Sequence, residues 1–263
     1  MITSLHSPHV EAVKALLGSR GNKARRDTGT YVVESLQNIR ELLTCSPTEV
    51  TSLYLTEDGR HKLSEVPLGI FDIHDVSPEV MKAMTDTVTP QGLLAVARIP
   101  RRNISTVISQ SSPSAKFAYF WQIQDPGNAG TIIRAADAFG FDGIFFSDES
   151  VDAYSPKVVR SSAGSHWHIP IVEDVSLDAL IAAAKDGTCE LFATEASAPN
   201  DLLDIARESA SSRAIWIFGN EARGIPSNLR AKQVSIPIHG KAESLNLATA
   251  ASVVMYAVSA ARK

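Results

Sequence analysis

The second half of the chain alternates short apolar runs with amphipathic segments, and this pattern restricts the fold more than any other feature. Apolar runs predict strands at 118–122, 143–147, 191–194, 214–218 and 234–238. Helices are predicted at 131–139, 155–161, 177–185, 202–208 and 244–261. Strands separated by helices indicate an α/β fold with a mainly parallel sheet covered on both faces. Ligands of such proteins bind at the carboxyl edge of the sheet, so the loops after the strands are candidate sites.

The first hundred residues repeat this alternation on a smaller scale. Strands are predicted at 30–34, 52–56, 70–73 and 92–97, helices at 5–20, 36–43 and 78–84, and a basic connector at 18–29. Residues 103–116 are rich in serine and poor in large apolar side chains, which is typical of a linker. We therefore expect a smaller α/β domain at 1–102, a linker at 103–116 and a larger domain at 117–263.

Composition narrows the class of protein. The 263 residues are 44% hydrophobic and 21% charged, as in ordinary globular proteins, and no stretch resembles a signal peptide or a good membrane span. The two cysteines, Cys45 and Cys189, lie far apart without metal-ligand spacing. This pattern predicts a cytoplasmic protein with core thiols, no metal and no membrane.

Charge is unevenly distributed along the chain. The net charge of −4 disfavours a protein that coats nucleic acid non-specifically. Residues 1–40 nevertheless carry six basic and three acidic side chains, and Lys23, Arg25 and Arg26 form the densest group. This group is a candidate contact for RNA phosphates, with a solvated helix face as an equally good interpretation.

The first candidate loop, residues 125–134, joins a predicted strand to a helix. A Pro-Gly turn followed by Asn128 is a credible helix entry, and Arg134 follows within the first turns. Arg134 could bind a ligand there, or it could form an ordinary salt bridge.

The second candidate loop, residues 218–226, follows an apolar strand and contains Gly219, Glu221 and Gly224. Its glycines permit close approach of a ligand to the backbone, although a plain tight turn would use them equally well. The chain has no G-x-G-x-x-G between a strand and a helix and no phosphate-binding Gly-Lys-Ser/Thr loop, which disfavours a nucleotide-dependent dehydrogenase.

The third candidate loop, residues 236–247, runs from a strand end through a polar segment to a helix start. Ser244 and Asn246 lie where side-chain and backbone groups could hold a ligand. Asn246 could instead cap a buried C-terminal helix, and these two roles are compatible.

In this order and spacing the three loops resemble the motifs of the SpoU/TrmH family of RNA ribose 2′-O-methyltransferases. The first motif matches Asn128 and Arg134, the second matches Gly219-Asn220-Glu221 with Gly224, and the third matches Ile236-Pro237 through Ser244-Leu245-Asn246. Residues 155–165 are also typical of the family. The N-terminal part is similar, more loosely, to a substrate-binding domain with a fold like that of ribosomal protein L30e, although Ser35 stands where glycine is commoner.

The resemblance implies a fold, a cofactor and an activity. Family members thread their C-terminal segment through a loop to form a deep trefoil knot, bind S-adenosyl-L-methionine, methylate a ribose 2′-hydroxyl and work as homodimers. By this likeness, the cofactor contacts are Thr194, Glu195, Gly219, Ile236, Ile238 and Leu245. The catalytic set is Asn128, Arg134, Glu221, Ser244 and Asn246, and Arg160 is a further candidate contact for RNA.

Two questions stay open at the level of sequence. Arg134 is assigned in the family to activate the hydroxyl, but an arginine is a poor base, so it could instead orient a phosphate and stabilise the alkoxide. The substrate is expected to be 23S rRNA, with tRNA as the alternative, or with an inactive RNA-binding assembly factor as a non-enzymatic one. His166 and His168, beside Trp167, are expected to be packed or surface residues because neither lies in a family motif.

Overall fold

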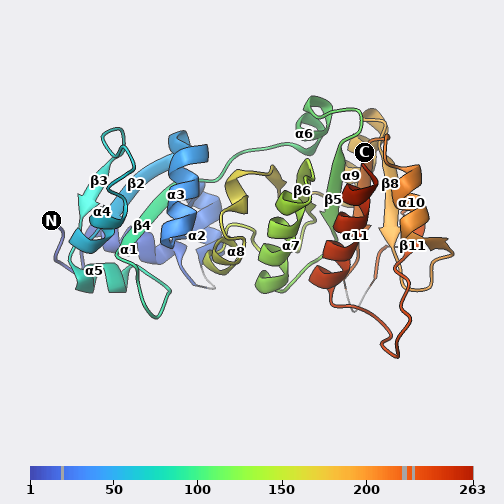
Figure 1. Ribbon diagram of the computed structural model, residues 1–263. Coiled ribbons are helices and arrows are strands. Elements are labelled where there is room, and N and C mark those ends of the chain that lie inside the picture. The colour runs from blue at the N-terminus through green and yellow to red at the C-terminus, as the bar shows by residue number, and fades with distance from the viewer. Residues whose placement is uncertain (19–20, 221–223, 227–228, 263) are drawn as a thin grey trace. The chain divides into compact units, whose positions relative to one another are not determined.

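The chain forms two compact units in the computed structural model, which describes residues 1–18, 21–220, 224–226 and 229–262 (Figure 1). Unit 1 comprises Met1–Pro100 and Asp152–His168, and unit 2 comprises Arg101–Val151 and Ile169–Lys263. Within the described ranges, no helix has both the length and the apolar character needed to cross a membrane.

Unit 2 is built on a seven-stranded sheet in the order β7-β6-β5-β10-β8-β11-β9, and every strand pair in it is parallel. The predicted parallel α/β sheet is therefore confirmed. Its strands are β5 (Lys116–Phe120), β6 (Gly143–Phe146), β7 (Ile171–Val172), β8 (Glu190–Thr194), β9 (Asn200–Asp201), β10 (Ala214–Phe218) and β11 (Lys232–Ser235). The two-residue strands β7 and β9 were not predicted, because they are too short to show a periodic pattern of apolar residues in the sequence.

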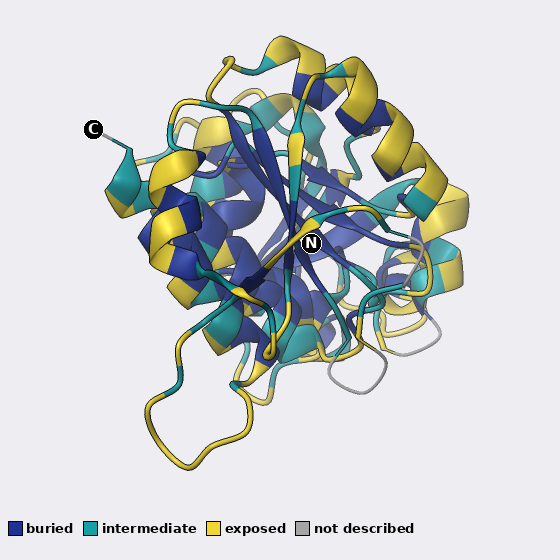
Figure 2. Ribbon diagram, turned by 90° about the vertical axis from the view of Figure 1, so that its right-hand side faces the viewer, coloured by how far each residue is buried: buried dark blue, intermediate teal, exposed yellow. Residues whose placement is uncertain are grey.

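Helices cover both faces of this sheet. They are α6 (Ile104–Gln110), α7 (Pro126–Ala138), α9 (Leu177–Asp186), α10 (Leu202–Glu208) and α11 (Leu247–Ala261). Helices α6 and α9 pack together on one face, and α11 contacts both α7 and α10 on the other (Figure 1). Figure 2 shows the strands buried between helices whose outer sides are exposed.

Aromatic side chains fill the core on both faces of the central strands. Phe117 stacks on Phe145 on the side of α6 and α9, with ring centroids 5.4 Å apart. Phe120 stacks on Phe218 with centroids 4.8 Å apart, and alternation along β5 places this pair on the opposite side. All four rings are essentially inaccessible to solvent, in keeping with strands β6 and β10 that are apolar throughout.

Unit 1 has a four-stranded mixed sheet in the order β1-β4-β2-β3, in which only β2 and β3 are parallel. Its strands are β1 (Thr30–Glu34), β2 (Val50–Leu55), β3 (Ile73–Asp75) and β4 (Leu93–Arg98). Its helices are α1 (Pro8–Leu16), α2 (Gly21–Thr28), α3 (Leu36–Cys45), η1 (Pro47–Glu49), α4 (Glu57–Lys62), α5 (Pro78–Ala83), α8 (Pro156–Ser161) and η2 (Ser165–Trp167). The smaller α/β domain is thus present, with α4 and the 3-10 turns not foreseen.

The predicted linker at 103–116 is wrong, because most of it is the capped helix α6. The Asn103 side chain accepts from the backbone N–H of Ser105, 2.8 Å away, and begins the helix. Ile104, Val107 and Ile108 lie buried in the core of unit 2. These three residues have helical spacing, but the serines around them outweighed that signal in the sequence.

The predicted boundary at 117 also needs correction, because residues 152–168 belong to unit 1. The Trp167 indole N–H donates to the Tyr31 hydroxyl oxygen, 3.1 Å away. Arg160 forms an ion pair with the buried Glu34 carboxylate, with Nη1 and Oε2 2.8 Å apart. The sequence predicts α8 as another helix of the parallel-sheet domain. Local periodicity reveals that a helix is present, but it carries no information on which domain the helix joins.

The basic connector predicted at 18–29 contains helix α2. Its Arg25 side chain is buried, donates to the Leu16 carbonyl and pairs with Asp152, with Nη2 and Oδ2 2.7 Å apart. A buried arginine is stable only when it is paired, so Arg25 is a structural residue that ties α2 to the 152–168 segment.

The backbone conformation at Ser35 explains why glycine is commoner at this position in the family. Its φ of 77° lies in the left-handed region that favours glycine. Its hydroxyl accepts from the N–H of Asn38 and so caps helix α3. The cap compensates in part for the strained backbone.

His166 is a packed residue, as expected, and lies at the centre of a polar network inside unit 1. Its Nε2 lies 2.7 Å from the Ala153 carbonyl oxygen and its Nδ1 lies 2.6 Å from Ser162 Oγ. A neutral ring that donates from Nε2 and accepts at Nδ1 satisfies both partners. Burial lowers the pKa of His166 from 6.5 to about 4, because the imidazolium form cannot be solvated there, and the bond to Ala153 offsets this only in part.

We predict that the neutral form of His166 makes stability depend on pH. The unfolded chain binds a proton near pH 6.5 and the folded chain only near pH 4, so the contribution is complete above pH 6.5 and is lost as the pH falls towards 4. The free energy of unfolding should fall by up to about 3 kcal/mol over this range. Denaturant titrations of His166→Asn should lack this component, and those of the exposed control His6→Asn should retain it. If the free energy of unfolding of His166→Asn depended on pH as steeply as that of the natural chain, His166 would not be the source of the pH dependence.

Candidate active site

A cavity of about 540 Å³ lies at the carboxyl edge of the unit 2 sheet, among the loops that follow β8, β10 and β11. Its lining combines apolar side chains with polar groups in similar measure, and polar groups fix the orientation of a ligand in small-molecule sites. Five predicted site residues lie in it: Thr194, Glu195, Gly219, Ser244 and Leu245. The strands are parallel, so their loops meet at one edge although they lie far apart in sequence.

A smaller hollow of about 130 Å³ adjoins this cavity and shares six of its lining residues. It adds Ile236 and Ile238, which follow directly after β11. All six residues that the resemblance assigns to cofactor binding therefore gather in these two connected spaces.

Gly219, Asn220 and residues 224–226 form one wall of the cavity, and Asn220 pairs with Gly224 across a turn. The backbone N–H of Gly224 donates to the Asn220 carbonyl oxygen, 2.8 Å away, and Gly224 has a φ of 65°. A Cβ atom on Gly219 would lie 2.7 Å from the Gly224 carbonyl carbon and from Ile225 Cγ1. Gly219 is thus required for the turn to close on itself. Glu221, which the resemblance assigns to the catalytic set, lies outside the described residues.

Asn246 caps helix α11 and also contacts the first motif. Its Oδ1 atom accepts from the N–H groups of Ala248 and Thr249, at 3.0 and 3.3 Å, and caps helix α11. Its amide also donates to Asn128 Oδ1, 3.3 Å away on helix α7. The first and third motifs, 118 residues apart, therefore meet through a direct side-chain contact.

Arg134 lies on α7, six residues beyond Asn128, and its side chain is exposed. Among the described residues it has no hydrogen-bond or ion-pair partner, so the salt-bridge interpretation finds no support there. Helices α7 and α11 lie side by side (Figure 1). An arginine without an internal partner can bind an external phosphate or other anion.

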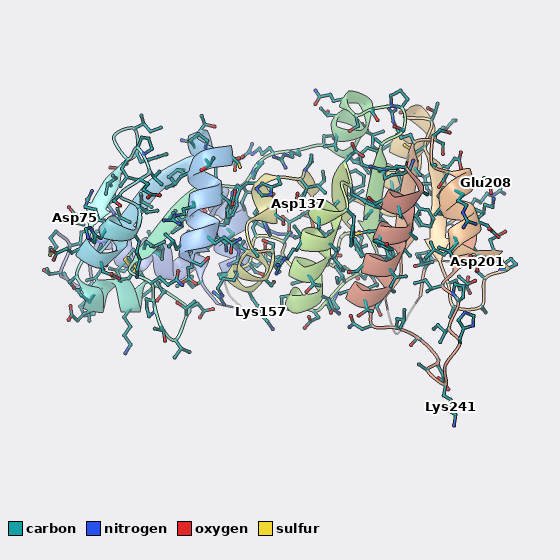
Figure 3. All side chains as sticks on the ribbon, viewed as in Figure 1. Asp75, Asp137, Lys157, Asp201, Glu208 and Lys241 are labelled. Atoms are coloured by element: carbon teal, nitrogen blue, oxygen red, sulfur yellow. The ribbon has the colours of Figure 1, made fainter. Side chains whose placement is uncertain are left out.

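The loop between β11 and α11 leaves one side of the site open. Figure 3 shows Lys241 at its tip, with the side chain directed away from the helices. Residues 239–244 are all exposed, including Ser244 at the cavity edge. The loop therefore presents polar groups and one cation to solvent beside the cavity.

The loop that follows β5 is a further element of the site that the sequence does not predict. Gln122 has a φ of 51°, and its carbonyl oxygen accepts from the Asn220 side chain, 2.9 Å away. The Gln122 side chain donates to Glu149 at 2.8 Å. These bonds connect the loops after β5, β6 and β10. A non-glycine residue in the left-handed region gives no sequence signal, so these contacts could not be foreseen.

The predicted RNA contacts in unit 1 separate into two groups. Lys23 and Arg26 are exposed on α2, as a phosphate contact requires. Arg25 is buried, so its prediction as an RNA contact is wrong. Arg160 is partly exposed, but it pairs with the buried Glu34, and its Nη2 lies 3.9 Å from Asp86 Oδ2, so two carboxylates already face its charge.

Comparison with known proteins connects this geometry to a family. The model for the SpoU rRNA Methylase family matches residues 117–256, which is more than half of the chain. The chain belongs to the SpoU rRNA methylase family. A second model, for the MRM3-like substrate binding domain, matches residues 8–95.

The relatives of this SpoU family chain include rRNA-modifying enzymes. It is 32% identical over 237 residues to the 23S rRNA (guanosine(2553)-2′-O)-methyltransferase RlmP of Bacillus subtilis, covering 89% of this chain and 90% of that protein. It is 28% identical over 257 residues to the 23S rRNA (uridine(2479)-2′-O)-methyltransferase of Streptomyces viridochromogenes, covering 92% and 86%.

Solved structures have the same fold over almost the whole chain. An AdoMet-bound rRNA methyltransferase from Sinorhizobium meliloti aligns with a TM-score of 0.84 at 26% identity and covers 98% of this chain and 96% of that one. The SpoU methyltransferase AviRb from Streptomyces viridochromogenes, in complex with AdoMet, aligns with a TM-score of 0.83 at 25% identity and covers 97% and 98%. The similarity thus extends through both units.

We predict that the two bonds of Asn246 can be separated by mutation. Asn246→Ala removes the cap of α11 and should lower the free energy of unfolding by about 1 kcal/mol. Asn246→Asp keeps an acceptor for the helix N–H groups but cannot donate to Asn128, so its stability should stay within about 0.5 kcal/mol of the natural chain. Denaturant titration measures both values. Equal destabilisation by Ala and Asp would assign the stability to the Asn128 contact instead of the cap.

Proposed function

We propose that this chain transfers a methyl group from S-adenosyl-L-methionine to a ribose 2′-hydroxyl of 23S rRNA. The observation that carries the proposal is that residues of the second and third motifs line one cavity, and that Asn246 of the third motif bonds to Asn128 on the helix that carries the exposed Arg134. Two relatives aligned over most of their length are named as 23S rRNA 2′-O-methyltransferases, which favours this substrate over tRNA. A ribosomal RNA substrate places the reaction in the cytoplasm.

The residues around the cavity suit this cofactor. A volume of about 540 Å³ lined by both apolar and polar groups accommodates a nucleoside with a short polar chain. Ile236, Ile238 and Leu245 supply apolar contacts for the adenine, and Glu195 can accept from ribose hydroxyls. The Thr194 hydroxyl donates to the Ile217 carbonyl oxygen, 3.2 Å away, so its own oxygen can still accept. When bound, the cofactor supplies a methyl group on a positively charged sulfur that an oxygen nucleophile can attack.

Arg134 orients the RNA in this proposal and does not act as the base. A guanidinium keeps its proton up to a pKa of about 12 or more, so it is a poor proton acceptor at neutral pH. Its charge can hold a phosphate beside the reacting ribose and stabilise negative charge that develops on the 2′-oxygen. Orientation of the hydroxyl towards the cofactor then accounts for much of the rate.

Asn128, Ser244 and Asn246 complete the proposed reaction site, together with Glu221. The bond between Asn246 and Asn128 fixes the amide of each residue, and a fixed amide positions a nucleotide better than a free one. Ser244 is exposed at the mouth of the cavity, where its hydroxyl can contact the nucleotide or the cofactor.

The chain between β10 and α11 forms a deep trefoil knot in this proposal. Two features support it: β11 pairs with β8 and β9 inside the sheet, and Gly219, Asn220 and residues 224–226 share one cavity with Ser244 and Leu245. Knots are rare exceptions to the usual connection rules, and this one brings two loops around the cofactor.

The proposed enzyme is a homodimer that pairs through α10 and α11. A groove of about 450 Å³ runs along these helices and is lined mainly by apolar side chains. Leu203 and Tyr256 are 52% and 62% exposed there, an unusual state for large apolar residues unless a partner covers them. A second copy offers the same face, as a two-fold interface requires.

Substrate recognition is assigned to unit 1 in the proposal. Lys23 and Arg26 on α2 supply exposed positive charge for RNA phosphates, within a domain matched by a substrate-binding model. The acidic net charge of −4 favours recognition of a folded RNA site over broad coating.

Mapping of 2′-O-methyl groups tests the function directly. Total RNA from cells with and without the gene should differ at one or more 23S rRNA riboses, and the purified enzyme should transfer labelled methyl to unmodified 23S rRNA. Methylation confined to tRNA would establish the tRNA alternative. RNA binding without methyl transfer would identify an inactive assembly factor and reject the proposal.

We predict that Arg134→Ala lowers turnover by at least about 100-fold, the size expected for a positioned group in the transition state. Arg134 does not line the cavity, so cofactor binding should persist: S-adenosylmethionine or its demethylated product should still raise the melting temperature, and NAD should not. Arg134→Lys should retain part of the rate, because it keeps the charge. The control Lys185→Ala removes an exposed cation on α9, at the other face of the sheet, and should be fully active. Normal turnover by Arg134→Ala would remove this residue from the mechanism.

We predict that a charge on the groove of α10 and α11 dissociates the dimer. Tyr256→Glu places a carboxylate on the apolar face, where pairing would bury it without a partner. Light scattering at micromolar concentration should give the mass of one chain for this variant and of two chains for the natural protein. The control Ile70→Glu changes a residue that is 78% exposed on unit 1 and should remain dimeric. A dimeric Tyr256→Glu would place the interface elsewhere.

A further inference from the structure

We propose that Glu41, Cys45 and His168 form a binding site for a zinc-like divalent metal ion on unit 1. This site is unrelated to the proposed methyl transfer and departs from the expectation of no metal. That expectation was based on the wide separation of the two cysteines in sequence, whereas the other two ligands of this group are a carboxylate and an imidazole.

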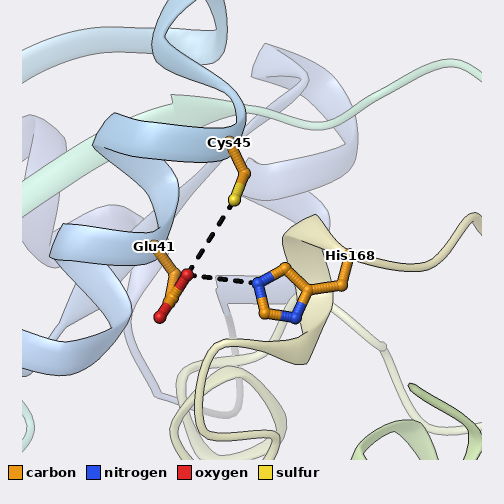
Figure 4. A group of neighbouring side chains, drawn as sticks. All are labelled: Glu41, Cys45 and His168. Atoms are coloured by element: carbon orange, nitrogen blue, oxygen red, sulfur yellow. Dashed lines mark hydrogen bonds and ion pairs between the residues drawn. The ribbon is translucent and has the colours of Figure 1, made fainter. Parts of the chain in front are cut away.

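The three donor atoms come from two segments of unit 1 (Figure 4). Glu41 and Cys45 lie four residues apart on α3, so their side chains share one face of the helix. His168 follows η2 at the end of the 152–168 segment. Glu41 Oε2 lies 3.1 Å from His168 Nε2 and 3.9 Å from Cys45 Sγ, and all three donor atoms lie within 4.8 Å of one another.

These separations match a tetrahedral ion. Zinc binds nitrogen and oxygen at about 2.0–2.1 Å and sulfur at about 2.3 Å, so neighbouring ligand atoms in a tetrahedron lie roughly 3.3–3.7 Å apart. Side-chain rotations that move the donor atoms by up to about 1 Å bring all three to those separations. Thiolate, imidazole and carboxylate together favour zinc or cobalt over magnesium and calcium, which prefer oxygen ligands alone.

The scaffold around the three ligands is held in place without an ion. The Gln37 and Asn38 side-chain amides donate from α3 to the carbonyl oxygens of Ala163 and Val159, at 3.1 and 3.2 Å. Gly164 has a φ of 103°, and a Cβ atom there would lie 2.7 Å from Glu41 Cγ. The 152–168 segment thus contacts α3 so closely that it restricts the Glu41 side chain, and a preorganised site binds its ion more tightly.

Binding would convert the hydrogen bond between His168 and Glu41 into a cross-link between α3 and the 152–168 segment. The Cys45 thiol loses its proton to become a ligand, and neutral His168 moves its ring proton from Nε2 to Nδ1. The side chains of Glu41 and His168 are 34% and 35% exposed, which leaves room for a water molecule as fourth ligand. The ion would stabilise unit 1 because it binds only the folded arrangement.

Cobalt substitution of the full-length protein tests this proposal without any measurement of activity. Co²⁺ added to the reduced protein should give visible bands of a four-coordinate ion and a thiolate-to-cobalt band in the near ultraviolet, saturating at one ion per chain. Zn²⁺ should displace it and raise the melting temperature.

Matched variants assign the ligands. Cys45→Ser should abolish the thiolate band. His168→Gln should weaken cobalt binding at least about 10-fold, because loss of even an outer hydrogen-bond partner of a metal ligand weakens binding by that factor. Cys189→Ser, which removes the other thiol, should bind cobalt as the natural chain does. Identical cobalt spectra for the natural chain and Cys45→Ser, or an octahedral spectrum without a thiolate band, would overturn the proposal.

Discussion

Parallel pairing of seven strands is the constraint on which the rest of unit 2 depends. Each parallel strand must be followed by a crossover that returns to the opposite edge, so the loops after β5, β8, β10 and β11 all lie at the carboxyl edge. Burial of the central strands on both faces, with rings such as Phe120 and Phe218 stacked between helices, fixes this arrangement energetically. The position of the cavity is therefore set mainly by the direction of the strands and not by any single residue.

The N-terminal ends of helices α7 and α11 place polar groups at the carboxyl edge of the apolar sheet. Helices α7 and α11 begin at this edge, where their first N–H groups need acceptors. Asp125 caps the first helix and Asn246 caps the second, and the spare amide of Asn246 reaches Asn128. The residues that stabilise the helix starts thus also set the distance between two motifs, so stability and proposed function share the same side chains.

Unit 1 is stabilised by a segment that lies about fifty residues beyond the rest of the unit in the sequence. Residues 152–168 bring Asp152 to the buried Arg25, Arg160 to the buried Glu34, and Trp167 to Tyr31. Each contact satisfies a buried polar group that would otherwise be costly, so the first hundred residues are not a self-sufficient domain. This dependence explains why arginines that look like RNA contacts in the sequence serve as internal ion pairs in the fold.

The sequence by itself determined the class of fold, most strands and helices, and the residues of the three motifs. Periodicity and capping are local properties, which is why β1, β10 and α10 begin and end where they were predicted. Tertiary structure alone decided that α6 is a core helix, that residues 152–168 belong to unit 1, and that Asn128 meets Asn246. It also decided that Arg25 is buried while Arg134 remains exposed. The physical reason is that pairing of distant segments and burial of individual charges depend on the whole packed chain, and neither leaves a signal in the spacing of neighbouring residues.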